Sequence, residues 1–308
     1  MKRLAITCGD PAGVGPEIIE RWLRALTEPE RDLAVIGPAV WLAGLPLRDD
    51  QLIPVGREDY AASAGQPDRE SALVAWTAME RAAAGCSAGE FAGVVTGPVS
   101  KSRLAQIGYP YPGQTEFFAA QWTGAPTMAF CGGKLRVVLL TWHIPLREVP
   151  AHLTMANFER TVIAAVELGR AEGFSAPRVG ICGLNPHAGE DGLLGTEERD
   201  LIDPMLERLS LTHPGLSRCQ PADTLFVRAL RGEFDVVVAL YHDQGLGPLK
   251  VVDFDESVNV TLGLAHVRTS PDHGTAYGIA GKGLASPRSL SNAVAVARRL
   301  VETRNSGA

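Results

Sequence analysis

The sequence predicts an α/β fold with mainly parallel sheets, divided into two domains around a cleft, and three observations support this. Short apolar runs typical of strands alternate along the chain with helical patterns, which favours parallel strands covered by helices. The length of 308 residues exceeds that at which one hydrophobic core usually stops growing. The 33 glycines and 45% hydrophobic residues are typical of a loop-rich soluble enzyme.

The individual elements follow from local patterns taken in chain order. Short apolar runs predict strands at 4–7, 34–36, 92–96, 135–140, 178–182 and 235–240. Amphipathic or periodic segments predict helices at 18–26, 72–84, 155–172 and 289–301, and another helix opens at Pro221. Residues 49–70 are polar and weakly patterned, so we interpret them as a peripheral connection.

Composition excludes several classes of protein. A net charge of −6 without clustered Lys and Arg argues against a nucleic-acid binder. No segment approaches the roughly 20 apolar residues of a membrane span, and the apolar run after Arg3 is too short for a signal peptide. The five cysteines are scattered without paired spacing, which is typical of reduced thiols. We therefore expect a cytoplasmic protein.

The first loop, Gly9 to Glu17, joins a strand to a helix but matches no nucleotide-binding motif. Its glycines at 9, 13 and 15 do not have the spacing GxGxxG, and no Walker lysine follows. On spacing alone, a plain strand-to-helix turn and a functional loop remain equally good interpretations.

The stretch Tyr241–Lys250, YHDQGLGPLK, follows the predicted strand 235–240. Ligands of open α/β sheets bind at the carboxyl ends of strands, so this polar cluster is placed to do chemistry. We expect Gly245, Gly247 and Pro248 to turn the backbone sharply towards a ligand. A hydrogen-bonded loop is the simpler interpretation of one His-Asp pair taken alone.

Three of the seven histidines, His143, His187 and His242, each follow the end of a different predicted strand. Three neutral imidazoles on one side of a sheet can hold a divalent ion and leave a position open for substrate. Three unrelated loop histidines are the alternative. His152, His213 and His266 lack this setting, and we interpret them as structural.

Nearly end to end, the chain resembles the 4-hydroxythreonine-4-phosphate dehydrogenase family of pyridoxal phosphate (pyridoxine) biosynthesis. The resemblance rests on GDPAGVGPE, GPVSK, GQTE, the His143 loop, GLNPHAGE, PADTLF, YHDQGLGPLK and DHGTA in the family's order. It implies a homodimer of two-domain subunits, akin to isocitrate and isopropylmalate dehydrogenases, with the active site in the interdomain cleft near the subunit interface. We place one domain at 1–128 plus 270–308 and the other at 129–269.

The resemblance also implies roles for individual residues. The equivalents of His143, His187 and His242 bind a divalent metal, for which Zn, Mg and Co are the candidates. The equivalents of five further residues contact a small phosphorylated hydroxy acid: Gln114, Thr115, Lys250, Asn259 and Arg268. Asp223 and Asp243 are the candidates for proton transfer or for orienting a histidine, and Lys250 is the candidate for stabilising the enolate left when carbon dioxide is lost. At the start of their predicted helices, Thr115 and Asp223 could instead be simple N-caps.

The cofactor is expected to be NAD or NADP. The loop His273-Gly274-Thr275-Ala276, continuing through Gly281–Gly283, is similar to the adenosine-binding loop of the β-decarboxylating dehydrogenases. Gly278 stands where the family pattern has an aspartate, which leaves the choice between NAD and NADP open.

The expected reaction is metal-assisted oxidation of the substrate alcohol, followed by loss of carbon dioxide from the keto acid. The family usually has histidine where this chain has Gln114, so a neutral amide replaces a group able to carry a proton. A paralogous dehydrogenase for a four-carbon sugar-acid phosphate or a dihydrodiol dicarboxylate is therefore one alternative. A non-catalytic protein that binds a metal or a phosphometabolite is another.

Overall fold

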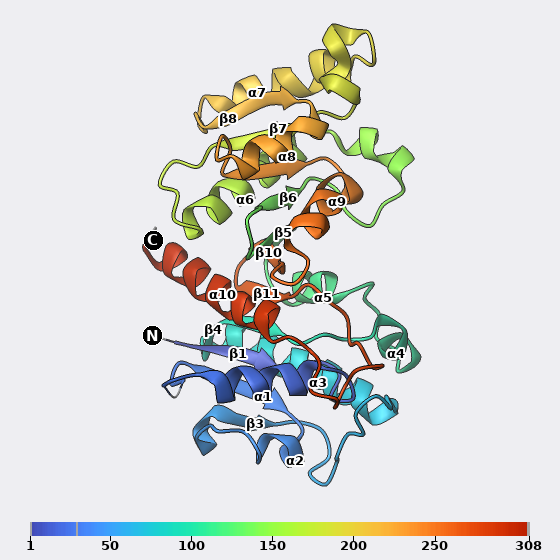
Figure 1. The fold of residues 1–308 in the computed structure, drawn as a ribbon, viewed down its shortest axis with the longest axis vertical. Coiled ribbons are helices and arrows are strands. Elements are labelled where there is room, and N and C mark those ends of the chain that lie inside the picture. The colour runs from blue at the N-terminus through green and yellow to red at the C-terminus, as the bar shows by residue number, and fades with distance from the viewer. Residues whose placement is uncertain (1, 29, 307–308) are drawn as a thin grey trace. The chain divides into compact units, whose positions relative to one another are not determined.

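The computed structural model describes residues 2–28 and 30–306, which form two compact units. The first unit runs to Pro126 and resumes over Leu264–Val301, and the second comprises Thr127–Gly263 with the end of the chain from Glu302. In both units, strands alternate with helices and most neighbouring strands run parallel (Figure 1). The predicted α/β fold with mainly parallel strands is confirmed.

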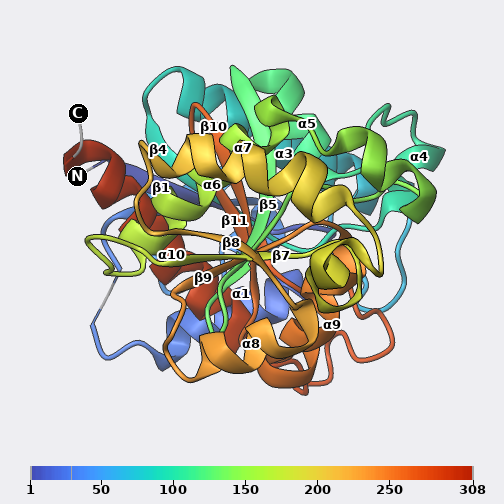
Figure 2. The same cartoon turned by 90° about the horizontal axis from the view of Figure 1, so that it is seen from above.

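The first unit contains a parallel sheet. Its strand order is β3 (Leu52–Pro54), β2 (Leu33–Gly37), β1 (Arg3–Thr7), β4 (Phe91–Thr96) and β11 (Val267–Pro271). Helix α3 (Arg69–Ser87) covers one face, and α1 (Gly15–Ala25) and α10 (Arg288–Ser306) cover the other (Figure 2). Every residue of β2 is buried, as expected for a strand covered on both faces. The shorter elements are α2 (Ala39–Leu42), η1 (Asp49–Gln51), α4 (Lys101–Gln106) and α5 (Gln114–Gln121).

In the second unit, the strand order is β10 (Val258–Leu264), β5 (Gly124–Cys131), β6 (Val137–Leu139), β9 (Val236–Ala239), β7 (Val179–Cys182) and β8 (Leu216–Gln220). Strands β5 and β6 are antiparallel, whereas β6, β9, β7 and β8 pair in parallel. Helices α6 (Met155–Ala171) and α7 (Asp203–Ser210) lie on one face, and α8 (Ala222–Leu230) and α9 (His242–Asp253) on the other (Figure 2). The short helical turns are η2 (Leu146–His152), η3 (Pro186–Gly192) and the π-helical η4 (Glu198–Ile202).

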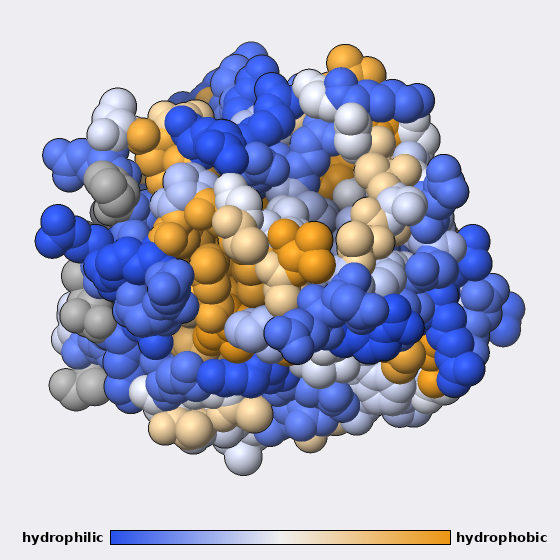
Figure 3. All heavy atoms as spheres, turned by 90° about the horizontal axis from the view of Figure 1, so that it is seen from below, coloured by the Kyte–Doolittle hydropathy of each residue, from blue (hydrophilic) through white to orange (hydrophobic). Residues whose placement is uncertain are grey.

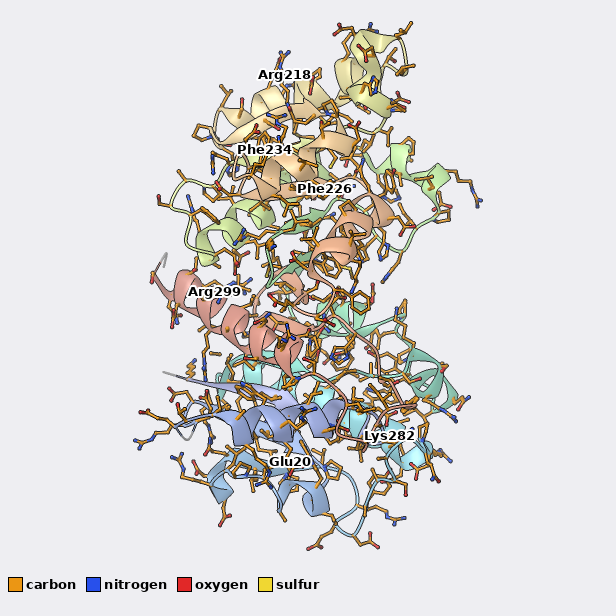
Figure 4. The ribbon with its side chains drawn as sticks, in the orientation of Figure 1. Glu20, Arg218, Phe226, Phe234, Lys282 and Arg299 are labelled. Atoms are coloured by element: carbon orange, nitrogen blue, oxygen red, sulfur yellow. The ribbon has the colours of Figure 1, made fainter. Side chains whose placement is uncertain are left out.

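Helix ends and cores account for much of this local structure. The Asp68 side chain caps α3 by accepting a hydrogen bond from the Ser71 amide at 2.7 Å. In the second unit, Phe226 of α8 is buried and Phe234 packs against the same core (Figure 4). Within residues 2–28 and 30–306, no helix combines the length and the apolar character needed to cross a membrane.

Two expectations about local structure were wrong. The stretch 241–250 does not turn sharply, because it forms most of α9. Gly245 instead lets α9 approach the sheet: a Cβ there would lie 2.8 Å from the side chains of Val137 and Leu139. The connection 49–70 includes β3, a short edge strand that pairs with β2.

Candidate active site

The three histidines singled out in the sequence follow three adjacent parallel strands of the second unit. His143 comes after β6, His242 opens α9 after β9, and His187 lies in η3 after β7. The strand order β6-β9-β7 places these loops at one edge of the sheet (Figure 1). This edge is where open α/β sheets bind ligands.

His143 and His242 lie together, with ring centroids 5.8 Å apart. They border a pocket of about 310 Å³, which is lined by Thr141, Trp142, His143, Ile144, Leu146, Val149, Tyr241, His242 and Asp243. Nδ1 of His242 is 2.7 Å from a carboxylate oxygen of Asp243. With Nδ1 engaged, Nε2 is the nitrogen of this imidazole that can bind an ion.

His187 begins an unusual turn in which residues 187–191 all have positive φ, although only Gly189 is a glycine. Nδ1 of His187 lies 2.7 Å from a carboxylate oxygen of Glu190, the same arrangement as in His242 and Asp243. Our interpretation of the sequence did not include Glu190, although its position three residues after the histidine was a usable signal. Across residues 2–28 and 30–306, no three His, Cys, Asp or Glu side chains are grouped closely enough to hold an ion.

The other predicted residues of this unit are spread over three elements. Asp223 is exposed in the first turn of α8, which follows β8 at the same sheet edge, and Pro221 rather than Asp223 is the N-cap. The Lys250 ammonium lies over the Phe254 ring, 5.4 Å from its centroid, and Asn259 lies in β10. Of the two candidates for proton transfer or for orienting a histidine, Asp243 contacts a predicted metal ligand, His242.

In the first unit, Gln114 and Thr115 begin α5, and Gly113 rather than Thr115 occupies the N-cap position. Thr115 is buried, so it does not serve as a surface cap. Nε2 of Gln114 donates to the Gly97 carbonyl at 3.3 Å. Its buried Oε1 has no hydrogen-bond partner among the described residues, which makes it an acceptor available to a ligand.

Arg268 is a buried residue of β11, the strand that pairs with β4. Its Nη2 donates to the Thr96 hydroxyl at 2.9 Å and to the Ser270 hydroxyl at 3.0 Å. Burial lowers the pKa of Arg268 to about 10, and the nearby Tyr109 and Glu116 oppose this change. A desolvated guanidinium can bind a carboxylate or phosphate strongly.

The predicted cofactor loop packs against the first loop of the chain. The Val14 amide donates to the Thr275 carbonyl at 2.9 Å, and the Tyr277 hydroxyl donates to the buried Asp10 carboxylate at 2.6 Å. Gly281 and Gly283 border a pocket of about 550 Å³ together with Pro11, Gly13, Trp41 and other residues of this unit. Seen from below, apolar side chains gather on one face of the molecule between hydrophilic margins (Figure 3).

Comparisons with known proteins agree on one family. Residues 25–297 match the family model described as pyridoxal phosphate biosynthetic protein PdxA. The chain is 43% identical to a 4-hydroxythreonine-4-phosphate dehydrogenase of Erythrobacter litoralis, covering 96% of this chain and 95% of that protein. A crystal structure of the enzyme of that name from Klebsiella pneumoniae has 32% identity and a TM-score of 0.81, covering 98% and 100%. A terephthalate 1,2-cis-dihydrodiol dehydrogenase from Burkholderia xenovorans has 27% identity and a TM-score of 0.70, covering 98% of each chain.

Proposed function

Because the chain belongs to the PdxA family of pyridoxal phosphate biosynthetic proteins, we propose that it oxidises 4-hydroxythreonine 4-phosphate with NAD(P) and a divalent metal. The observation that carries the proposal is the placement of three histidines after adjacent parallel strands. When bound, the nicotinamide would supply the hydride acceptor for the carbon that bears the hydroxyl, and a base of this protein would take the hydroxyl proton. The β-keto acid would then lose carbon dioxide, and the carbon that carried the carboxylate would take up a proton.

The chemistry of the donors fits a divalent metal. His187 and His242 each have Nδ1 beside a carboxylate, which favours Nε2 as the ligand atom. With His143 they form an all-imidazole set, which suits zinc or cobalt better than magnesium. When bound, the ion supplies a Lewis acid that favours ionisation of the substrate hydroxyl.

We assign the remaining steps to side chains of this protein. Asp243, beside His242, orients that imidazole, Asp223 is the candidate for taking or returning a proton, and Lys250 stabilises the enolate left when carbon dioxide is lost. Arg268 and Lys250 bind the anionic groups of the substrate, and Asn259 adds a hydrogen bond. Gln114 and Thr115 contact the substrate from the start of α5.

The direct test measures NADH or NADPH formation against a panel of 4-phosphorylated hydroxy acids, with and without a chelator. We expect turnover of 4-hydroxythreonine 4-phosphate that the chelator removes and added Zn²⁺ or Co²⁺ restores. Metal binding without turnover of any panel member would instead support a non-catalytic binding protein.

A second candidate is a paralogous dehydrogenase for a four-carbon sugar-acid phosphate or a dihydrodiol dicarboxylate. The observation that favours it is Gln114, whose neutral amide cannot carry a proton and whose Oε1 has no partner among the described residues. The same substrate panel separates the two, because this candidate predicts preference for acids that lack the amino group.

We propose that the adenosine half of the cofactor binds at the loop from His273 to Gly283. A Cβ at Gly278 would meet no atom within 4 Å, and Lys282 Nζ donates to the Gly278 carbonyl at 2.8 Å. Figure 4 labels Lys282 on this loop. There is therefore room for a larger side chain at Gly278, where a carboxylate could bind ribose hydroxyls.

Gly278→Asp is expected to raise the ratio of kcat/KM with NAD to kcat/KM with NADP by about tenfold, or roughly 1.4 kcal/mol. An aspartate accepts hydrogen bonds from ribose hydroxyls and repels a 2′-phosphate. Steady-state kinetics with both cofactors measure the ratio. Gly278→Asn is the matched neutral control, and an equal ratio in the two variants would remove Gly278 from cofactor choice.

We also propose that the protein works as a homodimer with its active site near the subunit interface. The support is membership of the family, for which the sequence predicts an active site beside a second subunit. Dilution to monomers should therefore abolish turnover. Sedimentation and activity measured over the same concentration series check this, and a fully active monomer would overturn the proposal.

A further inference from the structure

A chain of buried hydrogen bonds connects the three strand ends that carry the histidines. The Thr141 hydroxyl, at the end of β6, donates to the Leu240 carbonyl at the end of β9, at 2.6 Å. The Leu240 amide donates to Oε1 of Gln244 at 2.7 Å, and Nε2 of Gln244 donates to the Gly183 carbonyl at the end of β7, also at 2.7 Å. Gln244 thus bridges β9 and β7.

A second set of hydrogen bonds, made by Glu198, holds the start of the loop that carries His187. Oε1 of the buried Glu198 accepts hydrogen bonds from the Leu184 and Asn185 amides, each at 2.7 Å. Its Oε2 accepts a further bond from the Asn185 side chain at 3.0 Å. The side chains of Gln244 and Glu198 therefore hold the backbone from Gly183 to Asn185, which leads to His187.

We propose that Gln244 is a positioning residue that sets the separation between the strand ends carrying His242 and His187. The inference rests on the proposed metal-binding function and deepens it. The Gln244 amide supplies an acceptor for the Leu240 amide and a donor for the Gly183 carbonyl at once, which neither an ionised carboxylate nor an apolar side chain can do. Gln244 is 9% exposed, so water does not readily replace either bond.

Two substitutions of Gln244 test this positioning role, and they differ in which of its two hydrogen bonds they remove. Gln244→Glu keeps an acceptor for the Leu240 amide, and its ionised form places a second oxygen against the Gly183 carbonyl, which it repels; metal binding by this variant is therefore measured above about pH 8, where the ionised form is favoured. Gln244→Met has a similar size and removes both hydrogen bonds. In each variant the histidines remain, so a change in metal binding reports their placement.

Gln51→Glu is the matched control. Gln51 is 1% exposed, and its Nε2 donates to the carbonyls of Glu30 and Leu33 at 3.0 Å each, within the first unit. It is thus a buried amide that holds backbone carbonyls near a strand, but none of the three proposed metal ligands lies in its unit. We expect Gln51→Glu to have a lower Tm, as we expect for the Gln244 variants. It therefore shows what a loss of stability alone does to metal binding.

The experiment measures Zn²⁺ affinity of the full-length protein by chelator competition and records the absorption spectrum of its Co²⁺ form. We expect both Gln244 variants to bind Zn²⁺ roughly 10- to 100-fold more weakly, with an altered Co²⁺ spectrum, and Gln51→Glu to match wild type in both. A folded Gln244 variant with the Zn²⁺ affinity and Co²⁺ spectrum of wild type would overturn this inference but would leave the proposed function intact. Failure of the wild-type protein to bind either ion would overturn the proposed function and the inference with it.

Discussion

His242→Ala is expected to abolish turnover and to lower Zn²⁺ affinity by more than about 100-fold, because it removes one of the three imidazoles that we propose as metal ligands. His143→Ala and His187→Ala should have the same effect. None of the three side chains is buried, so truncation opens no cavity and the subunits should remain folded. Turnover and bound metal, measured on the same samples, check the expectation.

His143 and His187 need a second substitution, because both have positive φ, at 48° and 53°. Alanine is less favourable there than histidine, whereas asparagine tolerates this conformation. His143→Asn and His187→Asn therefore remove the imidazole with less backbone strain. His152→Ala, an exposed histidine in η2, is the control and should behave as wild type. Full activity without bound metal in any one variant would withdraw that histidine from the proposed ligands.

The placement of the histidines could be predicted because each follows a short apolar strand. The β-branched run of β9 is buried, as the sequence indicated, and its two neighbours β6 and β7 are parallel to it. In a parallel sheet the carboxyl ends of neighbouring strands share one edge, so chain order was enough to bring these loops together.

Other features could not be predicted, because they depend on contacts distant in sequence. Helix α9 forms despite Gly245, Gly247 and Pro248, all poor helix formers, because the helix packs against β6 and β9. Gln244 donates to a carbonyl 61 residues away, which no local pattern reports. The edge strand β3 has only three residues, none of them fully buried, too few for a clear alternation.

Gln114→His is expected to raise activity on 4-hydroxythreonine 4-phosphate relative to its des-amino sugar-acid analogue. Gln114 begins α5, holds the Gly97 carbonyl through Nε2, and has an acceptor oxygen without a partner among the described residues. If it contacts substrate, as we propose, its neutral amide supplies no proton or charge, whereas histidine can supply both. A mismatched buried polar group costs about 1 to 3 kcal/mol, so the ratio of the two kcat/KM values should change by roughly tenfold to a hundredfold.

Wild type and variant are compared on both substrates at several pH values, since a histidine that carries a proton should make the ratio depend on pH. Gln121→His, on the exposed end of the same helix, is the control and should leave the ratio unchanged. A ratio that stays constant in Gln114→His at every pH would mean that Gln114 does not set specificity. That result would favour 4-hydroxythreonine 4-phosphate over the sugar-acid alternative, because Gln114 is the observation on which the alternative depends.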